Sequence, residues 1–172
     1  MDLDHNLLLK KAFASPKLRQ HFVNKGTMFL YCDYAGFASR NVYGAACCTM
    51  FNRTISLSAK KLPLTKDQGS NYGEMMAVIF SLETLAAALL EEQPKVAVLF
   101  TDCIRISYLL GSEELLTALA KLNRLFPAVN IQIRYISKHK KNNPMHRLAH
   151  NAARAAACAC DDNSDPNKQP IS

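Results

Sequence analysis

Three carboxylates are the residues of this chain best placed to do chemistry. Asp33 follows the apolar run Met-Phe-Leu-Tyr-Cys, and Asp102 follows the apolar segment 96–101. Glu74 stands near the start of a long segment whose apolar residues recur at helical spacing. A carboxylate at the end of a buried strand is costly unless it is paired or bound to a metal. Three that converge would repel one another unless cations lay between them, and hard oxygen ligands select Mg²⁺ or Mn²⁺.

Two such ions suggest a class of reaction. Held about 4 Å apart, they can activate a water molecule and stabilise the leaving oxygen of a phosphodiester, without a side-chain nucleophile. The composition suits a polyanionic substrate, because 21 Lys and Arg stand against 14 Asp and Glu, for a formal net charge of +7. That charge favours nucleic acid over a membrane surface as partner. The alternative is that moderate basicity only aids solubility.

The hydrophobic patterns predict the elements that must position these carboxylates. In chain order, the predicted elements are strands over 28–34, 43–51 and 54–59, a helix over about 70–89, a strand over 96–101, helices over 104–110 and 113–125, a strand over 129–137, and a helix from 144 to about 160. Short turns between the first three strands indicate an antiparallel meander, and the alternation within 54–59 indicates one buried face. Asn71 is a possible N-cap of the long helix. This order predicts an α/β fold, with helices packed against a mixed sheet.

One domain accounts for most of the chain. Its 172 residues suffice for a single hydrophobic core, which we expect over 28–160. Residues 1–27 are expected to form an appended basic segment packed at the edge of this domain, with a helix start at Ser15-Pro16. The polar segment 161–172 is expected to be a disordered tail. The chain contains no nucleotide-binding fingerprint, and we expect a monomer without an organic cofactor.

The cysteines and the N-terminus bear on the cellular compartment. Six cysteines without a Cys-x-x-Cys pair indicate free thiols in a reducing, cytoplasmic setting. The first residues lack the positive start and the long apolar core of a signal peptide. The longest apolar helix carries Glu74 and Glu83, so no membrane span is expected.

Four short motifs, in their order along the chain, are similar to those of one enzyme family. They are Leu-Tyr-Cys-Asp33, Ser-Asn71-Tyr-Gly-Glu74, Phe-Thr-Asp102-Cys and Asn-Pro-Met-His-Arg-Leu-Ala-His150-Asn-Ala-Ala-Arg-Ala-Ala-Ala. Each motif is weak alone, but together they span roughly Met28 to Ala157 on the expected elements. The chain therefore resembles a type 1 ribonuclease H, or another member of the ribonuclease H-like fold. The resemblance implies a five-stranded mixed sheet, with three antiparallel strands and then parallel strands, flanked by helices. It also implies an endonuclease that cleaves the RNA strand of RNA–DNA hybrids, leaving 5′-phosphate and 3′-hydroxyl ends.

The resemblance assigns roles to the residues of these motifs. Asp33, Glu74 and Asp102 would be ligands of Mg²⁺ or Mn²⁺, with Asp33 bridging two ions. Asn71 would contact the hybrid beside the metal site, where sensing of the 2′-hydroxyl separates RNA from DNA. His150 stands where the family has a fourth carboxylate. Its imidazole would ligate a metal or shuttle a proton.

The resemblance also points to residues around the site. His139 is the nearest match to a mobile catalytic histidine of the family, although a loop histidine without such a role is an equal alternative. Tyr34 and Ala35 replace the small residues that commonly follow the first aspartate, where substrate approaches the backbone. Lys140 and Arg147 would face the phosphates of the hybrid, with a solvated charged surface as the alternative.

The sequence is compatible with several alternatives. His146 lies one helical turn before His150, so the two could form a metal pair, but we expect His146 at the surface or in contact with substrate. A protein of this fold that has lost catalysis would bind nucleic acid in a salt-dependent way without cutting it. A third possibility is a nuclease of the same fold that acts on DNA.

Overall fold

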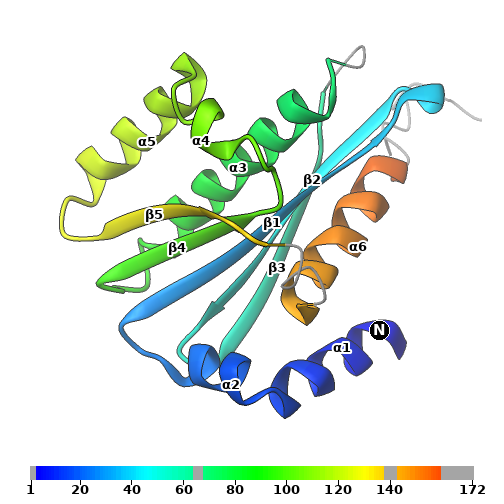
Figure 1. Cartoon of the computed structure of the whole chain (residues 1–172). Coiled ribbons are helices and arrows are strands. Elements are labelled where there is room, and N and C mark those ends of the chain that lie inside the picture. The colour runs from blue at the N-terminus through cyan, green and yellow to red at the C-terminus, as the bar shows by residue number, and fades with distance from the viewer. Residues whose placement is uncertain (1–2, 64–67, 138–142, 160–172) are drawn as a thin grey trace, which may run out of the picture.

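The computed structural model describes residues 3–63, 68–137 and 143–159. Five strands form one sheet in the order β3-β2-β1-β4-β5 (Figure 1). The strands are β1 (Thr27–Phe37), β2 (Val42–Phe51), β3 (Thr54–Lys61), β4 (Val96–Thr101) and β5 (Asn130–Tyr135). β1, β2 and β3 pair antiparallel, whereas β1 with β4 and β4 with β5 pair parallel. The predicted mixed sheet of five strands is confirmed.

Helices cover both faces of this sheet. In chain order they are α1 (Leu3–Ala14), α2 (Pro16–Val23), a 3-10 turn (Ala38–Arg40), α3 (Ser70–Ala88), α4 (Ile106–Leu109), α5 (Glu113–Leu125) and α6 (Pro144–Cys158). α6 lies on one face, over β1, β2 and β3, and α3 lies on the other face with α5 beside it (Figure 1). α1 and α2 lie at one end of the sheet, where α1 packs against α6. Among the described residues, none of the helices combines the length and apolarity needed to cross a membrane.

Side chains of β1 alternate between the two faces, as the period of a strand requires. Leu30 and Cys32 belong to the core beneath α3 and α5. Phe29 and Tyr31 belong to a second core beneath α6, α1 and α2. Asp33 continues this second series and therefore faces α6.

Some details differ from the sequence-based expectations. α3 begins at Ser70 and its N-cap is Gly69, whose positive φ of 89° suits glycine, so the prediction of Asn71 as N-cap was wrong. β3 is an edge strand, and the face expected to be buried is only partly covered, with Leu57 39% exposed. No strand lies beyond β3 in the described sheet, so its outer residues have fewer neighbours. α1 was not predicted as a helix.

Candidate metal centre

The sheet opens between β1 and β4 at the point where the predicted aspartates lie. The parallel pairing of these strands ends at Tyr31 and Phe100. Beyond that pair, β1 continues along β2, and Thr101 pairs with β5. Asp33 and Asp102 each lie two residues past the last pair of β1 with β4. Such a divergence beside parallel strands, at their carboxyl ends, is where α/β sheets place their sites.

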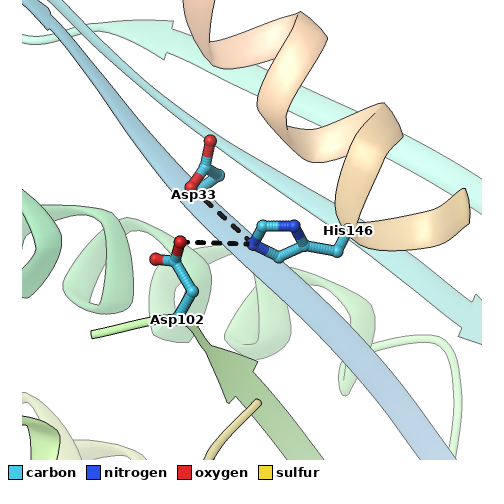
Figure 2. A group of neighbouring side chains, drawn as sticks. All are labelled: Asp33, Asp102 and His146. Atoms are coloured by element: carbon cyan, nitrogen blue, oxygen red, sulfur yellow. Dashed lines mark ion pairs between the residues drawn. The ribbon is translucent and has the colours of Figure 1, made fainter. Parts of the chain in front are cut away.

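Figure 2 shows three side chains that meet at this opening, Asp33, Asp102 and His146. The Nε2 atom of His146 lies 3.8 Å from Oδ1 of Asp33 and 3.9 Å from Oδ2 of Asp102. One potential ligand atom from each residue lies within 4.8 Å of the others. His146 is 6% exposed, and its Nε2 makes no hydrogen bond within the described part of the chain. A buried nitrogen therefore faces two carboxylates at distances too long for hydrogen bonds.

Asp33 has a second contact with α6. Its Oδ2 lies 2.7 Å from Nδ1 of His150, which donates the hydrogen bond when the carboxylate is ionised. The Asp33 side chain is only 4% exposed, whereas that of His150 is 47% exposed. Burial raises the pKa of Asp33, and the nearby charge of Asp102 raises it further, while His146 and His150 oppose the shift. Burial and the charge of Asp102 together outweigh the stabilisation that the two histidines provide to this carboxylate.

Glu74 approaches the same opening from the other side of the sheet. It lies in the first turns of α3, and one of its carboxylate oxygens is inaccessible to solvent. Burial is the main cause of the raised pKa of the Cys32 thiol, and the charge of Glu74 is the second. The charge of Glu74 also raises the pKa of Cys103. These two cysteines neighbour the aspartates in sequence, so Glu74 lies close to the opening. It is not a member of the three-residue group that His146 completes.

The donor set fits a divalent cation. Carboxylate oxygens and an imidazole nitrogen together are ligands for Mn²⁺ and other first-row metals. A buried nitrogen without a hydrogen bond is costly, and so is a second carboxylate, Asp102, beside the buried carboxylate of Asp33. A bound cation would offset both costs, and the fit rests on the positions of Asp33, Asp102 and His146.

The remaining predicted site residues occupy varied positions. The ring of Tyr34 stacks on Tyr43, with centroids 6.4 Å apart, and fills the space beside Gly73 that a Cβ there would need. Ala35 is buried beneath α6, in a cluster of alanines. Asn71 is exposed in the first turn of α3, and Arg147 is exposed on α6. His139, Lys140 and the tail 161–172 lie outside the described residues.

Sequence reasoning placed His146 incorrectly. The expectation that it lies at the surface was wrong, because it is buried beside the two aspartates. The alternative, contact with substrate, stays a prediction. The available signal was the spacing of His146 from Ala149, Ala153 and Ala157, which recur every three or four residues and form the buried face of α6. A histidine on that face must point toward the sheet.

No protein-family model and no curated protein sequence matches this chain. Solved structures do match. The ribonuclease H1 of Halobacterium salinarum NRC-1 aligns with a TM-score of 0.53 and 16% identity, over 76% of this chain and 97% of that chain. LC11-RNase H1, solved in complex with an RNA/DNA hybrid, aligns with a TM-score of 0.55 and 15% identity, over 75% and 98%. This chain has the ribonuclease H-like fold.

A third structure agrees with this assignment. The N-terminal RNase H domain of a Mycobacterium tuberculosis protein aligns with a TM-score of 0.52 and 16% identity, over 76% of this chain and 96% of that chain. The three matched chains are covered almost completely, so this chain contains the whole ribonuclease H-like fold. At these identities the matches establish the fold alone, and the chemistry has to be argued from the residues at the opening.

Proposed function

We propose that this protein is a divalent-metal-dependent endonuclease that hydrolyses the RNA strand of RNA–DNA hybrids. The observation that carries this proposal is the group formed by Asp33, Asp102 and His146 at the opening of a ribonuclease H-like sheet. The hybrid bound in the LC11-RNase H1 structure supports the class of substrate, as does the net charge of +7. Water would attack the phosphorus and the bond to the 3′ oxygen would break, leaving a 5′-phosphate and a 3′-hydroxyl.

Asp33, Asp102 and His146 would hold a cation, with Glu74 and His150 beside them. When bound, a divalent cation polarises the phosphodiester and lowers the pKa of a coordinated water. Asp33 is fixed for this role by its burial and by the hydrogen bond from His150. The imidazole of His146 favours Mn²⁺ over Mg²⁺, because Mg²⁺ strongly prefers oxygen ligands.

Residues with exposed polar groups would handle the substrate. His150 hydrogen bonds Asp33 through Nδ1, and its side chain is 47% exposed, so its Nε2 would exchange a proton with the reacting groups. Asn71 is exposed in the first turn of α3, and its amide would contact the 2′-hydroxyl of the RNA strand. Arg147 adds a positive charge for phosphates on the exposed side of α6.

The test is a cleavage assay on labelled RNA–DNA hybrid, duplex DNA and single-stranded RNA, each with Mg²⁺ or Mn²⁺. We expect cleavage of the hybrid, faster with Mn²⁺, and a loss of more than about 100-fold in Asp33→Asn, because changing a residue that only hydrogen bonds a metal ligand already costs about 10–100-fold. Glu83→Gln is the matched control, since it removes one carboxylate from the exposed face of α3. Cleavage that persists in Asp33→Asn would contradict the proposal, and preference for duplex DNA would reassign the substrate.

One observation favours a second candidate, a nucleic-acid-binding module without cleavage. His146 and His150 both approach Asp33, and protonated histidines would neutralise its charge without a metal. This candidate predicts hybrid binding that weakens with salt, no cleavage with either ion, and no thermal stabilisation by Mn²⁺. The same preparations therefore separate the two functions.

A further inference from the structure

A pocket of about 410 Å³ lies between the N-terminal helices and the sheet. Lys11, Ser15 and Lys17 line it from the helical side, and Tyr31, Phe100 and Ile136 line it from the sheet. Its volume lies in the range of sites that hold small ligands. None of the roles proposed above uses this pocket.

The pocket adjoins the metal centre on the same face of the sheet. Tyr31 and Phe100 form the last pair between β1 and β4, and each precedes an aspartate of the centre, Asp33 or Asp102, by two residues. Residues two apart on a strand face the same side. Pro144, which also lines the pocket, precedes the histidine of the centre by two residues. A ligand in the pocket would therefore lie next to a phosphodiester at the centre.

The helical side of the pocket suits a phosphate group. The two lysines supply positive charge, and none of the described residues that line the pocket is acidic. α2 begins here at Pro16, with no acidic residue in its first turn and no side-chain hydrogen bond from its N-cap, Ser15. The first N–H groups of a helix have no intrahelical acceptor, and the dipole at that end attracts anions.

The sheet side of the pocket suits a flat ring. Phe100 is half-buried and stacks on Tyr31, with centroids 5.2 Å apart. Burial raises the pKa of Tyr31 to about 12, so its hydroxyl stays protonated, and it interacts with the side chain of Asn143. Aromatic surfaces in a recess accept an unstacked base, whereas a duplex keeps its bases inside.

We propose that this pocket binds one unpaired nucleotide, with its phosphate at Lys11, Lys17 and the first turn of α2 and its base against Phe100. Because the pocket adjoins the metal centre, this nucleotide would belong to the strand that is cleaved. That assignment to the cleaved strand rests on the proposed function. The enzyme would then recognise the end of a strand, or a nucleotide next to an unpaired junction, rather than a continuous duplex alone.

Binding is tested first, in the absence of divalent metal. The full chain is titrated with AMP, UMP, adenosine and inorganic phosphate by calorimetry, with EDTA present, and amide NMR shifts map the site. We expect both nucleotides to bind and to shift the amides of Lys17, Leu18 and Phe100. Lys11→Ala/Lys17→Ala should bind AMP at least about tenfold more weakly, the loss expected when charge-assisted hydrogen bonds are removed.

Lys10→Ala/Lys25→Ala is the matched control, because it removes the same charge from exposed lysines that do not line the pocket. Equal losses in the two double variants, or shifts confined to another surface, would overturn the proposal. If inorganic phosphate binds as tightly as AMP, the proposed role of the base is wrong. If adenosine binds as tightly as AMP, the proposed role of the phosphate is wrong. Thermal unfolding of both double variants verifies that they fold.

Cleavage of hybrids that carry a terminal phosphate or a terminal hydroxyl on the RNA strand is tested second. We expect faster cleavage near the phosphorylated end in the wild type, and loss of that preference in Lys11→Ala/Lys17→Ala but not in Lys10→Ala/Lys25→Ala. If the protein binds AMP through the two lysines but cleaves no substrate, the nucleotide pocket is supported and the proposed nuclease function is wrong. If the protein cleaves hybrids but binds no nucleotide, the proposed nuclease function is supported and the proposed nucleotide pocket is wrong.

Discussion

Helix α6 meets the sheet through two different halves. Its first half carries His146 and His150 to the opening between β1 and β4, where both contact Asp33. Its second half carries Ala153 and Ala157, both completely buried, against the sheet. The first half thus covers two buried polar side chains, His146 and Asp33, whose desolvation costs free energy, and the second half buries small apolar side chains.

The second half explains how the first is held in place. Gly44 in β2 lies directly under the backbone of α6, and a Cβ there would overlap the backbone oxygen of Ala153. The helix approaches the sheet this closely only because alanines face a glycine. Close packing of this kind transmits small shifts along a rigid helix. The positions of the two histidines therefore depend on the contacts of Ala153 and Ala157 with Gly44, farther along the same helix.

The largest effect is expected from the buried histidine. His146→Ala should weaken Mn²⁺ binding by more than about 100-fold, whereas His150→Ala, which removes a hydrogen bond to a ligand, should weaken it by roughly 10–100-fold. Binding is measured by the shift in thermal midpoint as Mn²⁺ or Mg²⁺ is titrated. His146→Ala should lose the preference for Mn²⁺, and His150→Ala should keep it. A preference that survives in His146→Ala would show that this nitrogen is no ligand.

This comparison also shows what sequence alone could and could not predict. Asp33 and Asp102 were predictable because each follows a run of apolar residues, Asp33 within β1 and Asp102 just after β4, so their meeting required only the order of the strands. The burial of His146 could have been inferred from its place on the alanine face of α6. The sequence does not show that this face meets the opening between β1 and β4, because that depends on how the helix docks. The pocket under α2 could not be predicted, because it arises from the docking of separate elements. Its position depends on how Leu8 and Leu18 join the core beneath α6.

An intermediate effect is expected from the alanine-packed half. Gly44→Ala should destabilise the protein by about 1–3 kcal/mol, the usual cost of an added methyl group in a tightly packed site. Gly26→Ala is the control, because the nearest atom to its new Cβ is a side-chain oxygen of Asn24 at 3.5 Å. Chemical denaturation measures both, and Mn²⁺ titration shows whether the histidines have moved.

If the second half positions the first, Gly44→Ala also weakens Mn²⁺ binding by more than the loss of folded protein accounts for. A variant that is destabilised but binds Mn²⁺ with unchanged affinity in its folded fraction would separate the two halves of α6. The comparison would then describe neighbouring regions without mechanical coupling.

The smallest effect is a gain in stability at the metal centre itself. Asp33→Asn should stabilise the metal-free protein by on the order of 1 kcal/mol, raising the thermal midpoint by roughly 2–4 °C. The carboxylate is almost fully buried, and burial together with the charge of Asp102 outweighs the stabilisation from both histidines, whereas an amide carries no charge. The asparagine oxygen can still accept the hydrogen bond from His150. Asp102→Asn should gain less, because that side chain is 20% exposed.

Thermal unfolding in EDTA compares the two variants with the wild type, and Mn²⁺ is then added. We expect Mn²⁺ to stabilise the wild type and to have little effect on Asp33→Asn, so that the order of stabilities reverses. A loss of stability in metal-free Asp33→Asn would mean that the histidines already compensate the buried charge. In that case α6 would neutralise Asp33 by itself, and its polar half would serve structure as its alanine half does.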